Sequence, residues 1–459
     1  MDILSDTIAA VSTPRGTGGI AVIRTSGDES FEISDRVIKL KCGKKIAETT
    51  PGKLYMCTVI NENGTVDECM CTHFIAPNSY TGENSVEVYC HGGALCTSMV
   101  LETLFVAGAR QALAGEFTKR AYINGKLSLS AAEAVGELIH AKTKAAVTLS
   151  NSNMRGTLDT KLSEISEKLK ELLASVYVYI DYPDEELYDV TAPEMCEKLK
   201  EIKAEIDKLA KSYRSGMAVS EGINTAIVGT PNTGKSTLLN LLCRKNRAIV
   251  TDIAGTTRDI VTEDVVLGDV LLKLSDTAGV RETDDTVEKI GVELSLGAIN
   301  EASLIFAVFD GSRELSSDDI ELAENILSQN KTVIAIINKS DKGTLPKEKI
   351  ESMFENTLIL SAASHESREL IEKKVTELYL GDKLDFGTSP IVTTASRHAA
   401  LVLASESLEK AISLLSAGDE QTIAGTMCED AVAYLDESSG RTVSEDIVNS
   451  IFSKFCVGK

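Results

Sequence analysis

The chain has 459 residues, of which 43% are hydrophobic and 25% charged, and its formal net charge is −22 at pH 7. This length exceeds what one hydrophobic core supports, so the sequence predicts two or three folded domains. The acidic balance argues against a protein that coats nucleic acid regardless of its sequence, although a local basic patch or a basic partner still allows a nucleic-acid substrate.

The first residues, MDILSDTIAAVSTP, lack the basic and apolar regions of a secretory signal, and no apolar run reaches the length that spans a bilayer. The 10 cysteines are scattered, and the close pair Cys69 and Cys71 has no second pair beside it. This pattern is typical of reduced cysteines rather than of a metal site. We therefore expect a cytoplasmic protein.

The pattern of apolar and polar residues changes along the chain, which predicts a multidomain α/β plus α protein. Residues 1–120 alternate short β-rich runs (GIAVIRTSG, KLYMCTVI and ENSVEVYCHGG) with helical segments, as in a small α/β domain. Residues 121–215 repeat apolar positions at three- and four-residue spacing, as helices do, until the proline in DYPDEEL (181–187) interrupts them.

Residues 216–380 alternate apolar strand-like runs with helices, which predicts a doubly wound, mostly parallel sheet. The expected strands are NTAIVG, VLLKLSD, LIFAVFD, TVIAIIN and TLILS. Residues 381–459 are again mostly helical. Because the ends of an inserted domain usually lie close together, we expect the two helical flanks to form one bundle around the inserted sheet domain.

The segment GTPNTGKS (229–236) fits the pattern G-x-x-x-x-G-K-S, follows an expected strand and opens a helix, as a P-loop does. Its glycines let backbone N–H groups surround phosphate oxygens at the positive end of the helix. Lys235 is expected to reach the β- and γ-phosphates, and Ser236 to ligate Mg²⁺. Thr230 and Thr233 stand at positions of the pattern that tolerate variation.

Three further motifs follow in order, each at the end of an expected strand. DTAG (276–279) offers a carboxylate to Mg²⁺ through water and a glycine N–H to the γ-phosphate. In NKSD (338–341), Asp341 matches the N1–H and N2–H₂ donors of guanine, a pair that adenine lacks. SAA (361–363) suits a loop that closes over the base. The four motifs together predict a GTPase, with these GTP-binding residues: Asn232, Thr233, Gly234, Lys235, Ser236, Thr237, Thr251, Thr256, Thr257, Asp276, Thr277, Ala278, Gly279, Asn338, Lys339, Asp341, Ser361, Ala362 and Ala363.

The residue that positions the attacking water is not evident from the motifs. Val280 follows Gly279 and cannot orient water as the glutamine of Ras-like enzymes does. Five carboxylates in VRETDDTVEKIGVE (280–293) are candidates: Glu282, Asp284, Asp285, Glu288 and Glu293.

Switch I is expected in TDIAGTTRD (251–259), where Thr257 is a candidate Mg²⁺ ligand and Gly255 permits close approach to phosphate. No arginine stands at an evident finger position. The side-chain carbonyl of Asn232 is a candidate ligand for a monovalent cation, or alternatively a cap for the loop.

The ordered set GTPNTGKSTLLN, TDIAGTTRD, DTAGVRETDDTVEKIG, NKSD and the terminal FCVGK resembles the MnmE (TrmE) family of tRNA-modification GTPases. The resemblance continues through residues 77–93, 115–139 and 179–187 and covers nearly the whole chain. It implies an N-terminal tetrahydrofolate-binding and dimerisation domain, a helical domain in two parts and an inserted G domain. The corresponding segments are 1–120, then 121–215 with 381–459, and 216–380.

The resemblance also implies a reaction and its partners. A homodimer, together with a flavoprotein of the MnmG (GidA) type, would add an aminomethyl or carboxymethylaminomethyl group to C5 of wobble uridine in tRNA. A 5-formyl- or 5,10-methylene-tetrahydrofolate would supply the one-carbon unit, FAD and NADH would act on the partner, and hydrolysis of GTP would require Mg²⁺ and K⁺.

Two rival hypotheses exist. An Era-like ribosome-assembly GTPase is disfavoured by the folate-like N-terminal domain and the missing basic RNA-binding appendage. A folate enzyme with a vestigial GTPase is disfavoured by four intact residues of the nucleotide site, Lys235, Ser236, Asp276 and Asp341.

By the resemblance, family roles fall on particular residues of this chain. The water-orienting carboxylate falls on Glu288, and two G domains meeting in the presence of K⁺ would stimulate hydrolysis. The terminal C-x-G-K would point toward the folate site, with Cys456 acting in the modification and the SIFSKF helix anchoring the tail. The implied folate ligands are Arg24, Glu87, Lys126 and Lys459, and the implied K⁺ ligands are Asn232, Thr251, Ile253 and Thr256.

Overall fold

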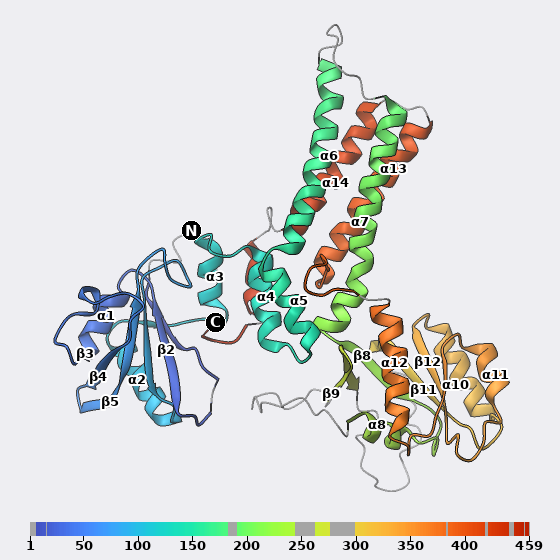
Figure 1. Cartoon of the computed structure of the whole chain (residues 1–459), viewed down its shortest axis with the longest axis horizontal. Helices are drawn as coiled ribbons and strands as arrows, with labels where there is room; N and C mark the ends of the chain where they lie inside the picture. The colour runs from blue at the N-terminus through green and yellow to red at the C-terminus, as the bar shows by residue number, and fades with distance from the viewer. Residues whose placement is uncertain are drawn as a thin grey trace. The chain divides into compact units, whose positions relative to one another are not determined.

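The computed structural model describes residues 6–14, 16–181, 191–243, 262–275, 299–381, 384–417, 421–439, 445–453 and 455–458. The chain divides into two compact units, one formed by residues 1–136 with 439–459 and the other by residues 137–438 (Figure 1). The predicted switch I (251–259), the DTAG motif with the carboxylates that follow it (276–293), and Lys459 lie outside the described residues.

The first unit is built on a seven-stranded sheet in the order β3-β4-β5-β6-β2-β1-β7. Neighbouring strands are antiparallel except β1 and β7, which are parallel. The three β-rich runs predicted from the sequence lie in β2, β4 and β6, whereas the long strand β5 was not predicted. The strands are β1 (Ile8–Val11), β2 (Ile20–Ser26), β3 (Ile38–Leu40), β4 (Tyr55–Asn61), β5 (Gly64–Phe74), β6 (Ser85–His91) and β7 (Arg110–Gln111).

Helices α1 (Ser30–Val37) and α2 (Ala94–Val106) contribute to the core of this unit, together with the short 3-10 helix η1 (Ile46–Glu48). Buried thiols fill part of that core, and the Sγ atoms of Cys57 and Cys69 lie 3.6 Å apart on β4 and β5 without a disulfide. Among the described residues, no group of three or more histidine, cysteine, aspartate or glutamate side chains is arranged to hold a metal ion.

A second, smaller core of the first unit joins both ends of the chain. Helix α3 (Glu116–Ile123) and the start of α4 (Leu129–His140) pack against α15 (Glu445–Ser453) through a cluster that includes Leu129, Ala132, Val448 and Phe452. Helix α15, which contains the C-terminal apolar run, therefore covers apolar side chains of α3 and α4, the helices that come after the N-terminal sheet in the chain.

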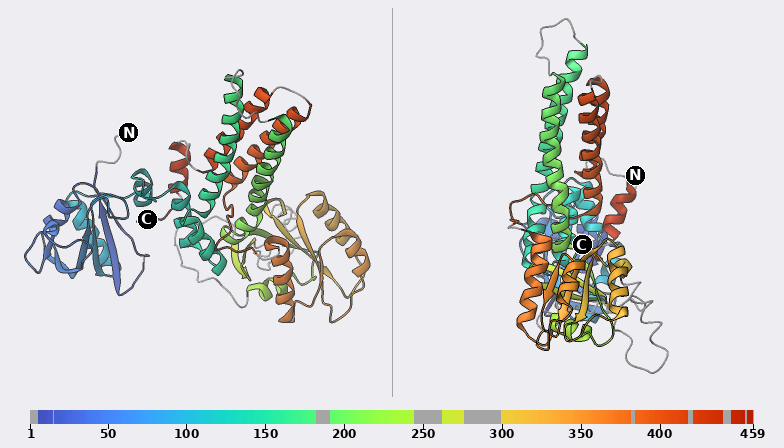
Figure 2. Two further views of the ribbon diagram at one scale, coloured as in Figure 1. Left: turned by 45° about the horizontal axis from the view of Figure 1, so that its top comes forward. Right: turned by 90° about the vertical axis from the view of Figure 1, so that its right-hand side faces the viewer.

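The helical part of the second unit is one bundle made from both flanks of the inserted domain (Figure 2). Side chains from α6, α7, α13 and α14 share a single core, which confirms the predicted two-part helical domain. Helix α7 begins with a capping box in which Thr191 and Glu194 satisfy each other's backbone N–H groups. The helices are α5 (Lys144–Met154), α6 (Thr157–Asp181), α7 (Ala192–Ser220), α13 (Ala395–Ala417) and α14 (Gln421–Ser438).

The inserted domain contains a six-stranded sheet in the order β13-β12-β11-β8-β10-β9, and its strands are parallel except for the β9–β10 pair. All five expected strands are present, and β9 is an additional edge strand. Buried clusters lie on both faces of the sheet, so the predicted doubly wound class is confirmed. The strands are β8 (Ile223–Val228), β9 (Thr262–Leu267), β10 (Val270–Ser275), β11 (Leu304–Asp310), β12 (Thr332–Asn338) and β13 (Thr357–Ile359).

The helices of the inserted domain are α8 (Lys235–Cys243), α10 (Ser317–Ser328), α11 (Lys347–Met353) and α12 (Glu366–Leu380). Leucines of α8 and the residues Ile371 and Val375 of α12 join one buried face, whereas Ala323 and Ile326 of α10 join the other. In the part of the chain that the structure describes, no helix is both long enough and apolar enough to cross a membrane.

Candidate functional site

The P-loop connects the end of β8 at Val228 to the start of α8 at Lys235. Its two glycines lie against neighbouring strand ends. A Cβ at Gly229 would overlap the carbonyl oxygen of Val308, and a Cβ at Gly234, whose φ is +99°, would overlap the side-chain amide of Asn338. Only glycine fits at both places, because the loop backbone has been drawn close to β11 and β12.

Lys235 folds back onto the loop that carries it. Its ammonium Nζ donates to the carbonyl oxygens of Gly229 at 2.8 Å and Thr230 at 3.0 Å. Burial lowers the pKa of Lys235, because burial disfavours the charged ammonium. An anionic phosphate near the loop would favour the ammonium more strongly than two neutral carbonyls do.

Asn338 joins three of the predicted motifs. Its Nδ2 donates to the Thr233 carbonyl at 2.8 Å, and its Oδ1 accepts from the Ala362 backbone N–H at 2.8 Å. Asn338 is only 3% exposed, so both of these bonds are shielded from water. The asparagine therefore ties the P-loop to the SAA loop across the carboxyl ends of the parallel strands.

Lys339 makes a second tie to the P-loop. Its Nζ donates to the Asn232 carbonyl and to Asp310 Oδ2, both at 2.6 Å. Burial opposes ionisation of Asp310, yet the Lys339 ammonium and the donors of Ser312 outweigh it and lower the pKa of Asp310 to about 2. Asp310 was not predicted as a site residue, although its position at the end of the run LIFAVFD was an available signal.

The carboxylate expected to select guanine lies beside the loop expected to close over the base. The pKa of Asp341 is lowered first by a hydrogen bond from the Ser361 hydroxyl and second by a hydrogen bond from the backbone N–H of Asp341 itself. Ser236 and Thr237 are exposed in the first turn of α8. The other predicted GTP and cation ligands, in segments 251–257 and 276–279, and Glu288 lie outside the described residues.

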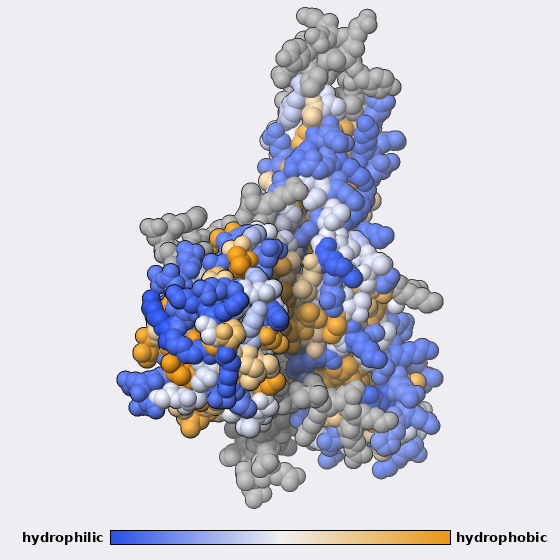
Figure 3. All heavy atoms as spheres, turned by 60° about the vertical axis from the view of Figure 1, so that its left-hand side comes forward, coloured by the Kyte–Doolittle hydropathy of each residue, from blue (hydrophilic) through white to orange (hydrophobic). Residues whose placement is uncertain are grey.

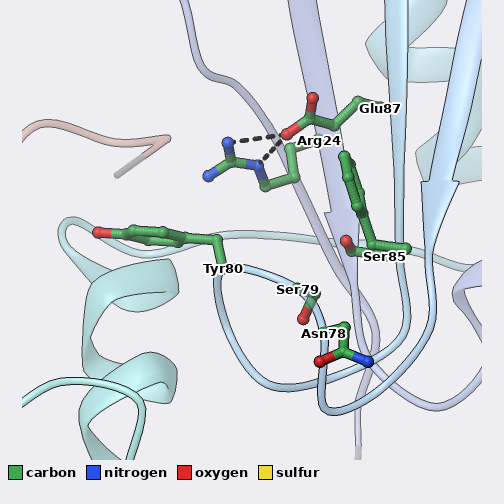
Figure 4. A pocket seen from close by; sticks show the side chains of 7 residues that line it. Arg24, Asn78, Ser79, Tyr80, Ser85 and Glu87 are labelled. Atoms are coloured by element: carbon green, nitrogen blue, oxygen red, sulfur yellow. Dashed lines mark hydrogen bonds and ion pairs between the residues drawn. The ribbon is translucent and has the colours of Figure 1, made fainter. Parts of the chain in front are cut away.

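A separate pocket opens in the first unit, where Arg24 of β2 is the cross-strand partner of Glu87 of β6 (Figure 4). The Nε and Nη2 atoms of Arg24 both lie 2.8 Å from Glu87 Oε1. The side chains of Arg24 and Glu87 are 19% and 12% exposed, so this ion pair is largely shielded from water but remains reachable. Further residues lining the pocket are Phe74, Asn78, Ser79, Tyr80 and Ser85.

Aromatic rings surround the Arg24 guanidinium. Its Cζ lies 5.2 Å from the centroid of the Tyr80 ring and 5.7 Å from that of Phe117. The Tyr89 hydroxyl donates to Glu87 Oε2 at 2.8 Å, and burial together with Glu87 raises the pKa of Tyr89 to about 12. These three aromatic residues were not predicted, because they come together only through the pairing of strands and the packing of α3.

Lys126 lies near the loop that carries Tyr80. A Cβ added to Gly82 would lie 3.2 Å from Lys126 Cγ, and Lys126 itself is exposed. The structure therefore brings Lys126 to the pocket loop, whereas it places Arg24 and Glu87 in direct contact.

The C-terminal tail is held on the same unit. Val457 forms an antiparallel bridge with Ala114, and the N–H of Gly115 donates to the Cys456 carbonyl at 3.4 Å. Gly115 lies next but one to Phe117, which contacts the Arg24 guanidinium. The tail that carries the exposed Cys456 is therefore held at Gly115, two residues before the Phe117 ring that contacts the Arg24 guanidinium.

Replacing Gly458 with alanine should detach this tail. Gly458 has φ +99°, and a Cβ there would overlap the carbonyl oxygen of Val11 on β1. We expect the peptide containing Ala114 and Gly115 to exchange its amide hydrogens faster in the variant, measured by mass spectrometry. Gly43→Ala is the matched control, because Gly43 also has a positive φ of +73° but no atom lies within 4 Å of its added Cβ. Equal exchange in Gly458→Ala and the parent would contradict this role.

Two family models match this chain in succession. The model for the GTP-binding protein TrmE N-terminus matches residues 7–126, and the model for the MnmE helical domain matches residues 129–456. A solved structure of Aquifex aeolicus Era bound to GDP.AlF4− covers 40% of this chain and 65% of that chain, at 28% identity and a TM-score of 0.26.

Two full-length relatives carry the name tRNA modification GTPase MnmE. The one from Clostridioides difficile (strain 630) is 40% identical over 459 residues, covering 99% of this chain and 100% of that protein. The one from Acetivibrio thermocellus is 39% identical over 465 residues, covering 99% of each. With nearly the whole length matched and both family models in order, the chain belongs to the MnmE (TrmE) family of tRNA modification GTPases.

Proposed function

We propose that this chain hydrolyses GTP and acts in the modification of tRNA at wobble uridine. The observation that carries the proposal is the contact of Asn338 with both the P-loop and the SAA loop, which gathers phosphate- and base-binding motifs at one edge of the parallel sheet. The relatives named tRNA modification GTPase MnmE support the tRNA substrate. The flavoprotein partner is proposed to be of the MnmG (GidA) type, carrying FAD and using NADH.

In this proposal Lys235 leaves the carbonyls of Gly229 and Thr230 and donates to the β- and γ-phosphates of GTP. Asp341 accepts from the guanine edge, and Glu288 orients the attacking water. Ser236 is exposed in the first turn of α8, and its hydroxyl is proposed to ligate Mg²⁺ together with Thr257. When bound, Mg²⁺ neutralises the charge that develops on the phosphates.

A potassium site is proposed at Asn232, with Thr251, Ile253 and Thr256 as its further ligands. Asn232 has φ 62° and an exposed side chain, while Lys339 holds its backbone carbonyl. The ligand in this proposal is the side-chain carbonyl oxygen of Asn232, because an amide oxygen beside the phosphate-binding loop is the type of ligand that a monovalent cation prefers. The cation supplies positive charge that an arginine finger supplies in other enzymes.

The Arg24 pocket is proposed to bind a tetrahydrofolate derivative, either 5-formyl- or 5,10-methylene-tetrahydrofolate. A pterin ring combines a flat face with hydrogen-bonding edges. The pocket offers aromatic side chains at Phe74 and Tyr80 and polar groups at Arg24 and Glu87. Lys126 and Lys459 are proposed to contact the anionic part of the ligand, and Cys456 to act in the modification, near this pocket.

The first unit is proposed to pair with a second copy of the chain. On the face drawn in Figure 3, hydrophobic side chains reach the surface of this unit among hydrophilic ones. Helix α2 exposes Leu95, Met99 and Val106 at helical spacing, with 75%, 36% and 91% of each residue accessible. This stripe supports a homodimer.

We also propose four domain segments for the family fold in this chain. They are a folate-binding and dimerisation domain (1–120), the two parts of the helical domain (121–215 and 381–459) and the G domain (216–380). The matches of the two family models, 7–126 and 129–456, support the division near residue 120.

Hydrolysis of GTP measured in KCl and in NaCl tests the proposal. We expect KCl to accelerate hydrolysis by the parent protein at least tenfold, because K⁺ at Asn232 adds charge stabilisation that Na⁺ does not match at the same ligand spacing. The Glu288→Ala variant should lose that acceleration, whereas the neighbouring Glu282→Ala variant should keep it. Release of inorganic phosphate under saturating GTP is the measurement.

The outcomes separate the parts of the proposal. Turnover at equal rates in both salts would remove potassium and leave a GTPase. No turnover and no binding of GTP would overturn the GTPase itself, and binding of 5-formyl-tetrahydrofolate, compared between the parent and Arg24→Ala, would then test the folate pocket alone.

A further inference from the structure

Thr230, the second residue of the P-loop, is held through both its side chain and its backbone. Its hydroxyl donates to Asp319 Oδ1 at 2.6 Å and accepts from Arg313 Nη2 at 3.3 Å. Its carbonyl oxygen accepts from Thr233 Oγ1 at 2.9 Å and from Lys235 Nζ at 3.0 Å. A position that the P-loop pattern leaves variable is therefore fixed in this chain by four hydrogen bonds.

Asp319 provides the fixed end of this arrangement. It is 1% exposed, and its Oδ2 accepts from the Ser316 N–H at 3.0 Å, the Ser316 hydroxyl at 2.8 Å and Arg313 Nη1 at 2.8 Å. Ser316 and Asp319 form the capping box of α10, so the carboxylate is attached to the start of a regular helix. Burial opposes its ionisation, but the bonds from Thr230, Ser316 and Arg313 outweigh burial and lower the pKa of Asp319.

The P-loop backbone needs such support before a nucleotide arrives. Asn232 has a left-handed φ of 62°, which costs any non-glycine residue some energy, although asparagine adopts it more readily than most. Thr230 lies on one side of Asn232 in the chain, held by Asp319, and Lys339 holds the Asn232 carbonyl itself. A loop fixed in its binding shape loses less conformational entropy when the ligand binds, so the ligand binds more tightly.

We propose that Asp319 is a positioning residue of the nucleotide site, which acts through Thr230 to keep the P-loop in its phosphate-binding shape. Asp319 does not touch the phosphates in this scheme. It fixes the Thr230 carbonyl from which Lys235 departs when GTP enters. This inference rests on the proposed binding of GTP and adds to it two residues, Asp319 and Thr230, that the P-loop pattern does not include.

Thr230→Val tests the inference with little change of shape, because valine keeps the volume of threonine but lacks the hydroxyl. Loss of this hydrogen bond to a carboxylate should weaken binding of fluorescent GDP about tenfold, because the loop is then less well held in the shape that the nucleotide binds. Thr230→Ser retains the hydroxyl and should bind GDP within about twofold of the parent. The KM for GTP should rise in Thr230→Val, while kcat at saturating GTP stays near the parent value.

Thermal unfolding of each variant is measured first, and GDP binding is then titrated at a temperature where the variant is fully folded. A merely structural role for the bond would lower the unfolding temperature and leave the GDP affinity of the folded protein unchanged. Asp319→Asn, which keeps the volume but removes the charge, should weaken GDP binding at least as much as Thr230→Val.

Three outcomes decide the inference. Weaker GDP binding in Thr230→Val that Thr230→Ser restores would support it. Equal GDP affinity in the parent, Thr230→Val and Asp319→Asn would overturn it while leaving the proposed GTPase intact. A parent protein that binds neither GDP nor GTP would instead overturn the proposed function on which it rests.

Discussion

Replacing Lys235 with methionine should reduce GTP hydrolysis about 100- to 1,000-fold, the range observed when one preorganised donor is removed from a charge-stabilising site. The Lys235 ammonium donates to the carbonyl oxygens of Gly229 and Thr230, which are neutral partners. Methionine keeps most of the apolar length of the side chain but offers no charge to the β- and γ-phosphates.

The same substitution should leave the folded protein about as stable as the parent, because it removes a partly buried charge whose pKa burial already lowers. Release of phosphate and thermal unfolding, measured on the same preparations, test both statements. Lys347→Met is the control. The Lys347 ammonium lies 3.9 Å from Glu351 on the same helix, and such an exposed ion pair contributes little to stability. Near-parental hydrolysis by Lys235→Met would mean that another group serves the phosphates.

The nucleotide-binding fold was predictable from sequence because its motifs stand where strands end. A strand of a parallel sheet is buried on both faces and reads as a continuous apolar run, as LIFAVFD and TVIAIIN do. The residues that bind phosphate follow such runs directly. Strand β9 escaped prediction because TEDVVL, at the edge of the sheet, begins with three polar residues and lacks that signature.

The Arg24 pocket was not predictable in the same way. Arg24 and Glu87 are 63 residues apart and meet through the pairing of β2 with β6, so the resemblance alone pointed to them. Tyr80 and Phe117 reach the guanidinium from a loop and from α3, and neither carries a local motif. Long-range packing of this kind leaves no periodicity in a single sequence.

Replacing Arg120 with methionine should destabilise the first unit by about 3–5 kcal/mol, because it removes the buried cation of an ion-pair network and leaves the carboxylates of that network with fewer partners. Arg120 is 0% exposed. Its Nη2 lies 2.8 Å from Asp6 Oδ1 and 2.9 Å from Glu116 Oε1, and its Nη1 lies 3.2 Å from Glu83 Oε2. This guanidinium therefore joins the segment that precedes β1, the pocket loop and α3, and its loss should loosen the loop that carries Tyr80.

Urea unfolding followed by circular dichroism measures the effect. Lys41→Met is the control, because Lys41 and Glu68 are both largely exposed and their ion pair should contribute less than about 1 kcal/mol. Should Arg120→Met fail to fold, Arg120→Lys keeps the charge with fewer donors and should show a smaller loss of stability. A loss in Arg120→Met no larger than in Lys41→Met would show that Arg110 alone satisfies the carboxylates of Asp6 and Glu116.

The network also sets how stability depends on pH. Hydrogen bonds from Arg110 first, and from Arg120, lower the pKa of Asp6 against burial, and burial of Glu116 is likewise outweighed by Arg110, the Leu113 N–H and Arg120. Because these pKa values are depressed on folding, the stabilisation is fully present above the unfolded values of about 4 and is lost as the pH falls through the folded values. Removing Arg120 raises the folded pKa values toward the unfolded ones, so unfolding of the variant should depend less on pH below about 4 than unfolding of the parent. An unchanged pH dependence in Arg120→Met would assign the acid sensitivity of this unit to Arg110 instead.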